Sequence, residues 1–243
     1  MASEIVTVCL DGVDGQDYAD ALAAALARYD EDSDDPRWEA QWRVGGDGLP
    51  LLAGRSTDAR VLWVDGICAG APRGLLDLDG AWAAAAAAAG RLWDTWQEFA
   101  AAYPKGRSLE DLYTESAADP LGYDSERALA DYAAQPVVVA APFRADGRAL
   151  GSEPPSLDLD PVGWFGLARD EYAERRAARL LPTAGLVTRE GEWLDPDQIL
   201  HGASAAEKML NDFRNRLAYF AHADAYLRGL PPDCFVVRVK VRT

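Results

Sequence analysis

The chain has 243 residues, of which 40 are acidic and 24 basic, so its formal net charge is −16 at pH 7. Apolar residues make up 49%, enough for a sizeable core, which argues against disorder. Binding of a phosphate backbone needs clustered Lys and Arg, so the charge argues against direct, non-specific nucleic acid binding. The sequence has no secretory leader pattern, no bilayer-length apolar run and only three widely spaced cysteines, Cys9, Cys68 and Cys234. We therefore expect a cytoplasmic protein without disulfides or a membrane partner.

The first half of the chain predicts both strands and helices. Runs rich in β-branched or aromatic residues predict strands at 4–10, 37–52 and 60–66, the second one interrupted by two glycines. A helix capped by Asp17 is predicted to run to Tyr29. Apolar residues at helical spacing predict the longest helix, rich in Ala and Trp, from Leu78 to Tyr103, with Asp79 as its cap.

The second half predicts a further mixture. Ser108 and Asp111 have the spacing of a capping box. Helices are predicted near 108–116, at 123–134, at 164–181 and from Ser204 to about Leu227, and strands at 136–143, at 233–243 and in a hairpin at 184–195. In the last strand, Val237, Val239 and Val241 should face away from Arg238, Lys240 and Arg242.

The order of these elements indicates the fold class. Strands and helices do not alternate strictly, so we expect an α+β fold whose largely antiparallel sheet packs with several helices. The Gly-, Pro- and acid-rich segment 144–161 is the best candidate for a long loop or hinge. It would separate an acidic amino-terminal part, 1–143, from a helix–hairpin–helix–strand part, 162–243, the two being packed as one domain.

Metal sites are poorly supported. The chain has only two histidines, His201 and His222, and no two cysteines at ligand spacing, which disfavours zinc. Asp30, Asp32 and Asp34 match the first, third and fifth positions of a calcium loop. The sixth position is Asp35 instead of Gly and the twelfth is Gln41 instead of Glu, so that motif fails where it matters most.

Other catalytic patterns are equally weak. Gly12 and Gly15 lie between a strand and a helix, but a third Gly and the Lys-Ser/Thr pair of a phosphate loop are missing. No nucleophile elbow occurs, and pairing of Cys234 with His222 stays open, although a packed apolar cysteine is the more usual outcome. We therefore expect a protein that is not an enzyme and needs no cofactor. The other hypothesis at this point is an enzyme whose catalytic residues form no recognisable sequence pattern, and a deep pocket lined by polar groups would favour it.

The segment 28–48 resembles a motif of a phage and prophage accessory family. RYDEDSDDPRWEAQWRVGGDG is similar to that family's Tyr-Asn/Asp…Lys-Trp-Asp-x-Trp-x-Ile-Gly-Gly-Arg-Trp. Trp38, Trp42, Gly45 and Gly46 match it, and we expect a structural role for them, the glycines permitting a positive φ or a close backbone approach. Asp47 and Gly48 stand where the family has Arg and Trp.

Three later segments resemble the same family. They are the acidic RGLLDLDG, the helix and hairpin ARDEYAERRAARLLPTAGLVTREGEWLD, and the terminal LRGLPPDCFVVRVKV. Some members of this group, in actinophages with large serine integrases, act as recombination directionality factors. The resemblance therefore implies a protein that binds a DNA-bound serine integrase and favours excision over integration.

The charge distribution suits that role. Residues 1–36 hold ten acids against one base, whereas 201–243 hold seven bases and four acids. An acidic surface steers association with basic partners. The candidate contact surface is the acidic run Asp30, Glu31, Asp32, Asp34 and Asp35. The alternative hypothesis is an acidic DNA mimic that inhibits a host nuclease, which acids confined to loops would count against.

Overall fold

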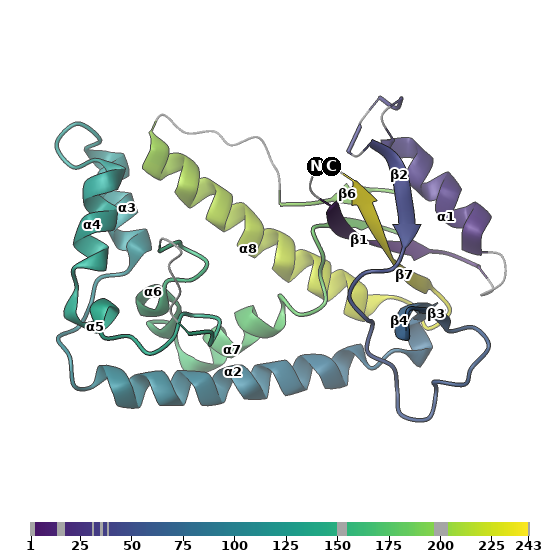
Figure 1. Cartoon of the computed structure of the whole chain (residues 1–243), viewed down its shortest axis with the longest axis horizontal. Coiled ribbons are helices and arrows are strands. Elements are labelled where there is room, and N and C mark those ends of the chain that lie inside the picture. Colours follow the sequence, from purple (N-terminus) through teal and green to yellow (C-terminus); the bar gives the residue numbers. More distant parts are fainter. Residues whose placement is uncertain are drawn as a thin grey trace. The chain divides into compact units, whose positions relative to one another are not determined.

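The structure is a computed structural model of the whole chain (Figure 1). It describes residues 3–13, 18–30, 32–34, 36–37, 39–149, 155–196 and 204–242, with the backbone alone at 39–41. The chain divides into two compact units. The first comprises Met1–Trp82, Ala178–Pro196 and Tyr219–Thr243, and the second Ala83–Ala177 and Asp197–Ala218. The first unit combines residues from both predicted parts, 1–143 and 162–243, because the last strand returns to pair with the first.

The first unit contains the sheet. Its seven strands are β1 (Ser3–Leu10), β2 (Glu39–Val44), β3 (Leu62–Val64), β4 (Ile67–Pro72), β5 (Gly185–Val187), β6 (Trp193–Leu194) and β7 (Phe235–Arg242). The strand order is β3-β4-β7-β1-β5-β6, and β2 also pairs with β7. Only the β1–β5 pair is parallel among the strand pairs of the described residues. The predicted α+β class with a largely antiparallel sheet is confirmed.

The terminal strand β7 is the centre of this sheet. Along one edge it pairs with β1 over its whole length, Phe235 opposite Leu10 and Arg242 opposite Ser3. Its other edge is shared, since β4 pairs with 235–237 and β2 with the carboxy-terminal half. A central strand covered on both faces needs apolar side chains on both faces, which explains the unbroken apolar run of Phe235, Val236 and Val237 before Arg238.

Helices cover both faces of the sheet within this unit. The helix α1 (Tyr18–Leu26) lies on the face formed by Phe235, Val237, Val239 and Val241 (Figure 1). The opposite face carries Cys9, Val236 and neighbouring apolar side chains, which pack against the carboxy-terminal end of α8 (Ala205–Gly229). The predicted alternation in the last strand is therefore confirmed. Arg238, however, is buried, because its face is covered by protein.

The second unit is helical in its described part. It is built from most of α2 (Leu78–Ala100), the first part of α8, and α3 (Leu109–Ala118), α4 (Ser125–Ala133), α5 (Pro136–Val139), α6 (Pro161–Phe165) and α7 (Arg169–Ala177). The predicted capping box is confirmed, because Ser108 and Asp111 exchange both hydrogen bonds. Trp96 is buried in this core and stacks on Phe165.

Two predictions in this region are wrong. The run 136–143 is not a strand: Pro136 begins the short helix α5, and a proline at the first helical position needs no N–H partner. The run 164–181 is two helices, α6 and α7, separated by a turn after Phe165. At 136–143 a short apolar run left the choice of element to tertiary packing, whereas at 164–181 the predicted helix is interrupted at Gly166, the C-cap of α6.

The described residues of the predicted loop 144–161 belong to this core. Ala145 N–H donates to the Leu159 carbonyl at 3.2 Å, and the Tyr172 hydroxyl donates to the Ala145 carbonyl at 2.9 Å. Asp160 is 2% exposed and accepts hydrogen bonds from three different segments. The described part of the segment is thus a packed part of the second unit.

Raising the pH above about 10 is expected to destabilise this unit through Tyr132 and Tyr172. Burial raises the pKa of Tyr172 to about 12 and also raises the pKa of Tyr132. Unfolded tyrosines release their protons near pH 10, so this stability is complete below pH 10 and is lost as pH rises towards the folded pKa.

The expected slope is at most about 1.4 kcal/mol per pH unit for each tyrosine. Urea unfolding at several pH values measures it, and Tyr172→Phe should make the slope less steep. An equally steep slope in that variant would contradict the assignment.

Candidate functional site

Three of the five acids of the predicted acidic surface, Asp30, Asp32 and Asp34, lie on a turn in the first unit. Asp32 and Asp34 are exposed, and Asp30 is half-buried. Ser33 closes the turn, its backbone N–H and its hydroxyl both donating to the Asp30 carbonyl, at 3.1 and 2.8 Å. The other two acids of the predicted surface, Glu31 and Asp35, lie outside the described residues. We call the described residues Asp30, Asp32, Ser33 and Asp34 the acidic turn.

Both flanks of the acidic turn are anchored in the first unit. The Tyr29 hydroxyl donates to the Gly191 carbonyl at 2.5 Å, and the Arg37 N–H donates to the Tyr29 carbonyl at 2.8 Å. Arg37 also forms an ion pair with Asp195 at 2.8 Å. Because these contacts hold the flanks to the β5–β6 hairpin, the exposed carboxylates between them are presented on a fixed base.

The glycines of the predicted motif mark the end of β2. Gly45 has φ +138° and Gly46 has φ +132°, and a Cβ on Gly46 would lie 3.0 Å from the Ile5 side chain. The expected positive φ and close approach are therefore both present. Trp42 packs against the core beneath α1, whereas Trp38 lies outside the described residues.

Directly after this motif the chain meets Arg238 of β7. The Arg238 guanidinium donates to the carbonyls of Asp47 at 3.0 Å and Gly48 at 3.4 Å through Nη1, and to the Leu181 carbonyl at 2.9 Å through Nη2. Burial lowers the pKa of Arg238. In the sequence Arg238 is one of three alternating basic residues, and no sequence signal separates it from Lys240 or Arg242.

Arg238 lies in the wall of a pocket in the first unit. The pocket is open and has a volume of about 1030 Å³. Its wall comes from the amino-terminal strand, the residues that follow β2, the β3–β4 hairpin, the segment 179–184 and the residues 219–220 of α8. The wall is largely apolar, and its charged members are Asp47, Arg179 and Arg238.

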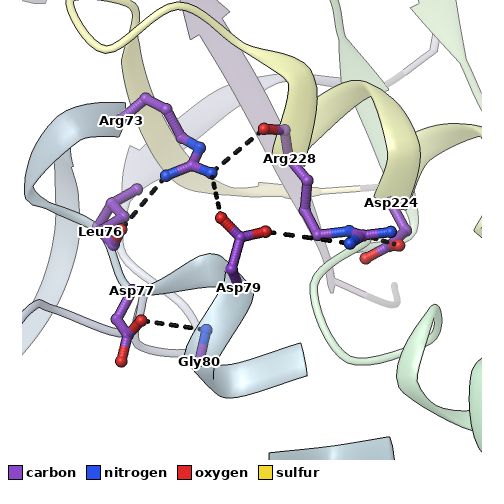
Figure 2. Close-up of polar contacts among 7 residues, drawn as sticks. All are labelled: Arg73, Leu76, Asp77, Asp79, Gly80, Asp224 and Arg228. Atoms are coloured by element: carbon purple, nitrogen blue, oxygen red, sulfur yellow. Dashed lines mark hydrogen bonds and ion pairs between the residues drawn. The ribbon is translucent and has the colours of Figure 1, made fainter. Parts of the chain in front are cut away.

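A cluster of charged side chains joins the start of α2 to the end of α8 within the first unit (Figure 2). Arg73 donates to the Leu76 carbonyl at 3.3 Å, and to the Arg228 carbonyl and the Asp79 carboxylate, both at 3.2 Å. Arg228 lies over the Trp82 ring, 4.8 Å from its centroid, and pairs with Asp224 at 3.1 Å. Burial raises the pKa of the Asp224 carboxyl.

These contacts have a structural explanation. The guanidinium groups of Arg73 and Arg228 neutralise the carboxylates around them, so we assign the cluster a stabilising role. The same region contains the N-terminal cap of α2, where the Gly80 N–H donates to the Asp77 carboxylate at 3.1 Å (Figure 2). The cap is therefore Asp77, not the predicted Asp79, which is engaged by Arg73 instead.

The cysteines are distant in the sequence, but two of them are neighbours in the fold. Cys9 lies on β1, and Cys234 directly precedes β7, which pairs with β1. The interaction with the Cys234 thiol and burial raise the pKa of the Cys9 thiol. Cys234 is fully buried whereas His222 is exposed, so the two do not form a nucleophile–base pair.

Among the described residues, no group of three or more His, Cys, Asp or Glu side chains is placed to hold a metal ion. Across the same part of the chain, every helix is too short or too polar to cross a bilayer. Comparison of the chain with protein-family models, with curated proteins and with solved structures found no match.

Proposed function

We propose that this protein is a phage or prophage accessory protein that binds a serine integrase and favours excision over integration. The observation that carries the proposal is the acidic turn, whose exposed carboxylates Asp32 and Asp34 stand on anchored flanks in a chain of net charge −16. The resemblance of 28–48 and of three later segments to the accessory family points to the same role.

The physical requirements of this role match the molecule. A protein that redirects a recombinase needs a surface complementary to a basic, DNA-bound enzyme, and it needs neither a catalytic centre nor affinity for DNA. Opposite charge raises the rate of encounter and fixes the orientation of docking more than it raises affinity. Asp32 and Asp34 lie on a turn that is already closed by hydrogen bonds. Association with a partner therefore has a small entropy cost for ordering this segment.

The first experiment uses the purified protein with its cognate integrase and DNA carrying the attL and attR sites. We expect excision product, and a shift of the integrase–DNA complex in a gel, only when the protein is present. Absence of both would overturn the proposal.

Neutralising the acidic turn tests the surface itself. For Asp32→Asn with Asp34→Asn we expect association with the integrase–DNA complex to slow by about fivefold to tenfold at low salt, and its salt dependence to weaken. Association rates measured by surface plasmon resonance at two ionic strengths provide the readout.

The matched control is Asp65→Asn with Asp233→Asn. These two aspartates are also exposed, belong to the same unit and lie outside the acidic turn, so the change in net charge is identical. Equal slowing in both double variants would show that net charge alone matters and would remove the acidic turn from the proposal.

One observation favours the alternative, a DNA mimic that inhibits a host nuclease. Exposed acids of the second unit lie on helices that pack side by side, Asp111 and Glu115 on α3 and Glu126 and Asp131 on α4 (Figure 1). Acids on helices can form a regular anionic face, which acids confined to loops cannot. Inhibition of a restriction nuclease, without any effect on the integrase, would favour this alternative.

A further inference from the structure

The pocket beside Arg238 has an apolar wall that is partly open to solvent. Its volume is about 1030 Å³, and all of its wall residues belong to the first unit. Trp63 is 44% exposed and Leu180 is 46% exposed, and both line the pocket together with Ile67 and Phe220. Exposed apolar surface gathered in a concavity is typical of a ligand-binding groove. A ligand of this pocket therefore needs an apolar body.

The charged side chains of the wall are already engaged by the protein itself. The Arg238 guanidinium donates to three backbone carbonyls, and the negative charge of Asp47 attracts it as well. The Arg179 guanidinium lies over the Phe220 ring, 4.7 Å from its centroid, and has further interactions within the chain. A charged ligand that enters the pocket therefore loses its water without gaining a free opposite charge, which is unfavourable.

Two hydroxyl groups of the wall are engaged in the same way. The Thr183 hydroxyl donates to the Gly185 carbonyl at 2.8 Å, and the Tyr219 hydroxyl donates to the Thr183 carbonyl, also at 2.8 Å. Tyr219 is buried, so its ring contributes to the wall while its hydroxyl proton is directed into the protein. These groups therefore do not compensate a ligand for the water that a polar or charged head group would lose.

We propose that this pocket binds an uncharged small molecule with a compact aromatic or hydrocarbon body. The body lies against Trp63, Leu180 and Phe220. Burial of apolar surface drives binding, and the cost of removing water from a charged group makes the pocket select against ions of either sign. The site does not include the acidic turn, so the inference stands independently of the proposed function.

The test is titration of the full chain with the neutral fluorescent probe N-phenyl-1-naphthylamine, at high salt so that the net charge of the protein is screened. Three ligands of nearly equal shape then compete with the probe: naphthalene-1-methanol, the anion 1-naphthoate and the cation 1-naphthylmethylammonium. We expect the alcohol to displace the probe at a concentration at least about tenfold lower than either ion. Failure of the probe to bind, or equal displacement by the alcohol and an ion, would overturn the proposal.

Variants at two wall positions locate the site. Gly48 lines the pocket, its φ is not in the left-handed region, and a Cβ there would lie at an ordinary 3.6 Å from Ile67. Gly48→Phe should therefore fill the pocket and abolish probe binding with the circular dichroism spectrum unchanged, whereas the matched control Gly48→Ala should keep it. Trp63→Ala, at an exposed position, should weaken binding severalfold. Undiminished binding to Gly48→Phe and Trp63→Ala would exclude this pocket as the site.

Discussion

Replacing Asp160 by alanine is expected to lower the free energy of unfolding by roughly 3–5 kcal/mol, the sum of a lost helix cap and two unsatisfied buried donors. The buried Asp160 carboxylate accepts from the Tyr132 hydroxyl at 2.5 Å, and from the N–H groups of Leu109 and Val162, both at 2.8 Å. It thereby joins α3, α4 and the start of α6. Urea unfolding followed by circular dichroism measures the loss.

The matched control is Asp124→Ala, in the same unit. Asp124 also caps a helix, accepting from the Arg127 N–H at 2.8 Å, but it is exposed. Its loss should cost only about 1 kcal/mol. Equal losses for the two variants would contradict the view that burial makes Asp160 important.

A double-mutant cycle isolates the buried contact. Tyr132→Phe alone should cost roughly 1.5–3 kcal/mol, because the removed hydrogen bond goes to a charged group. In the Asp160→Ala background its additional cost should be smaller, since the partner is already gone. Full additivity would mean that the two side chains do not act together.

Replacing Phe235 by alanine is expected to cost roughly 3–5 kcal/mol, as for other large aromatic side chains removed from a core. Phe235 is fully buried in β7, and its ring stacks on Tyr18, with 6.0 Å between centroids. Because β7 pairs with three other strands, a cavity beside it weakens the centre of the sheet. The urea midpoint of the variant measures the effect.

A variant at Gly70 on β4 tests the packing around the Phe235 ring from the neighbouring strand. A Cβ on Gly70 would lie 3.0 Å from the Phe235 ring, so Gly70→Ala should cost roughly 1–3 kcal/mol through overpacking. The combination with Phe235→Ala should cost less than the sum, because the ring has been removed.

Gly48→Ala is the matched glycine control, since a Cβ there would lie 3.6 Å from Ile67. It should change the free energy of unfolding by less than about 0.5 kcal/mol. A loss equal to that of Gly70→Ala would contradict the overpacking argument.

The predicted acidic surface can be recognised in the sequence, whereas the pocket cannot. A run of acids is visible in composition, and Asp32 and Asp34 are exposed in the structure. Arg238 has the same alternating pattern as Lys240 and Arg242, which are only half-buried. It becomes buried because the carbonyls of Asp47 and Leu181, distant in sequence, meet it in the fold.

Elements with a long or locally constrained pattern are predictable from the sequence alone. They are the strand β1, the helices α2 and α8, and the hairpin of β5 and β6, whose turn has Gly191 at φ +82° in the structure. The other features depend on tertiary packing: the helix α5, the neighbouring thiols of Cys9 and Cys234, and the division into two units. The reason is that local pattern sets the direction in which a side chain points, whereas the partner it meets depends on segments far away in the chain.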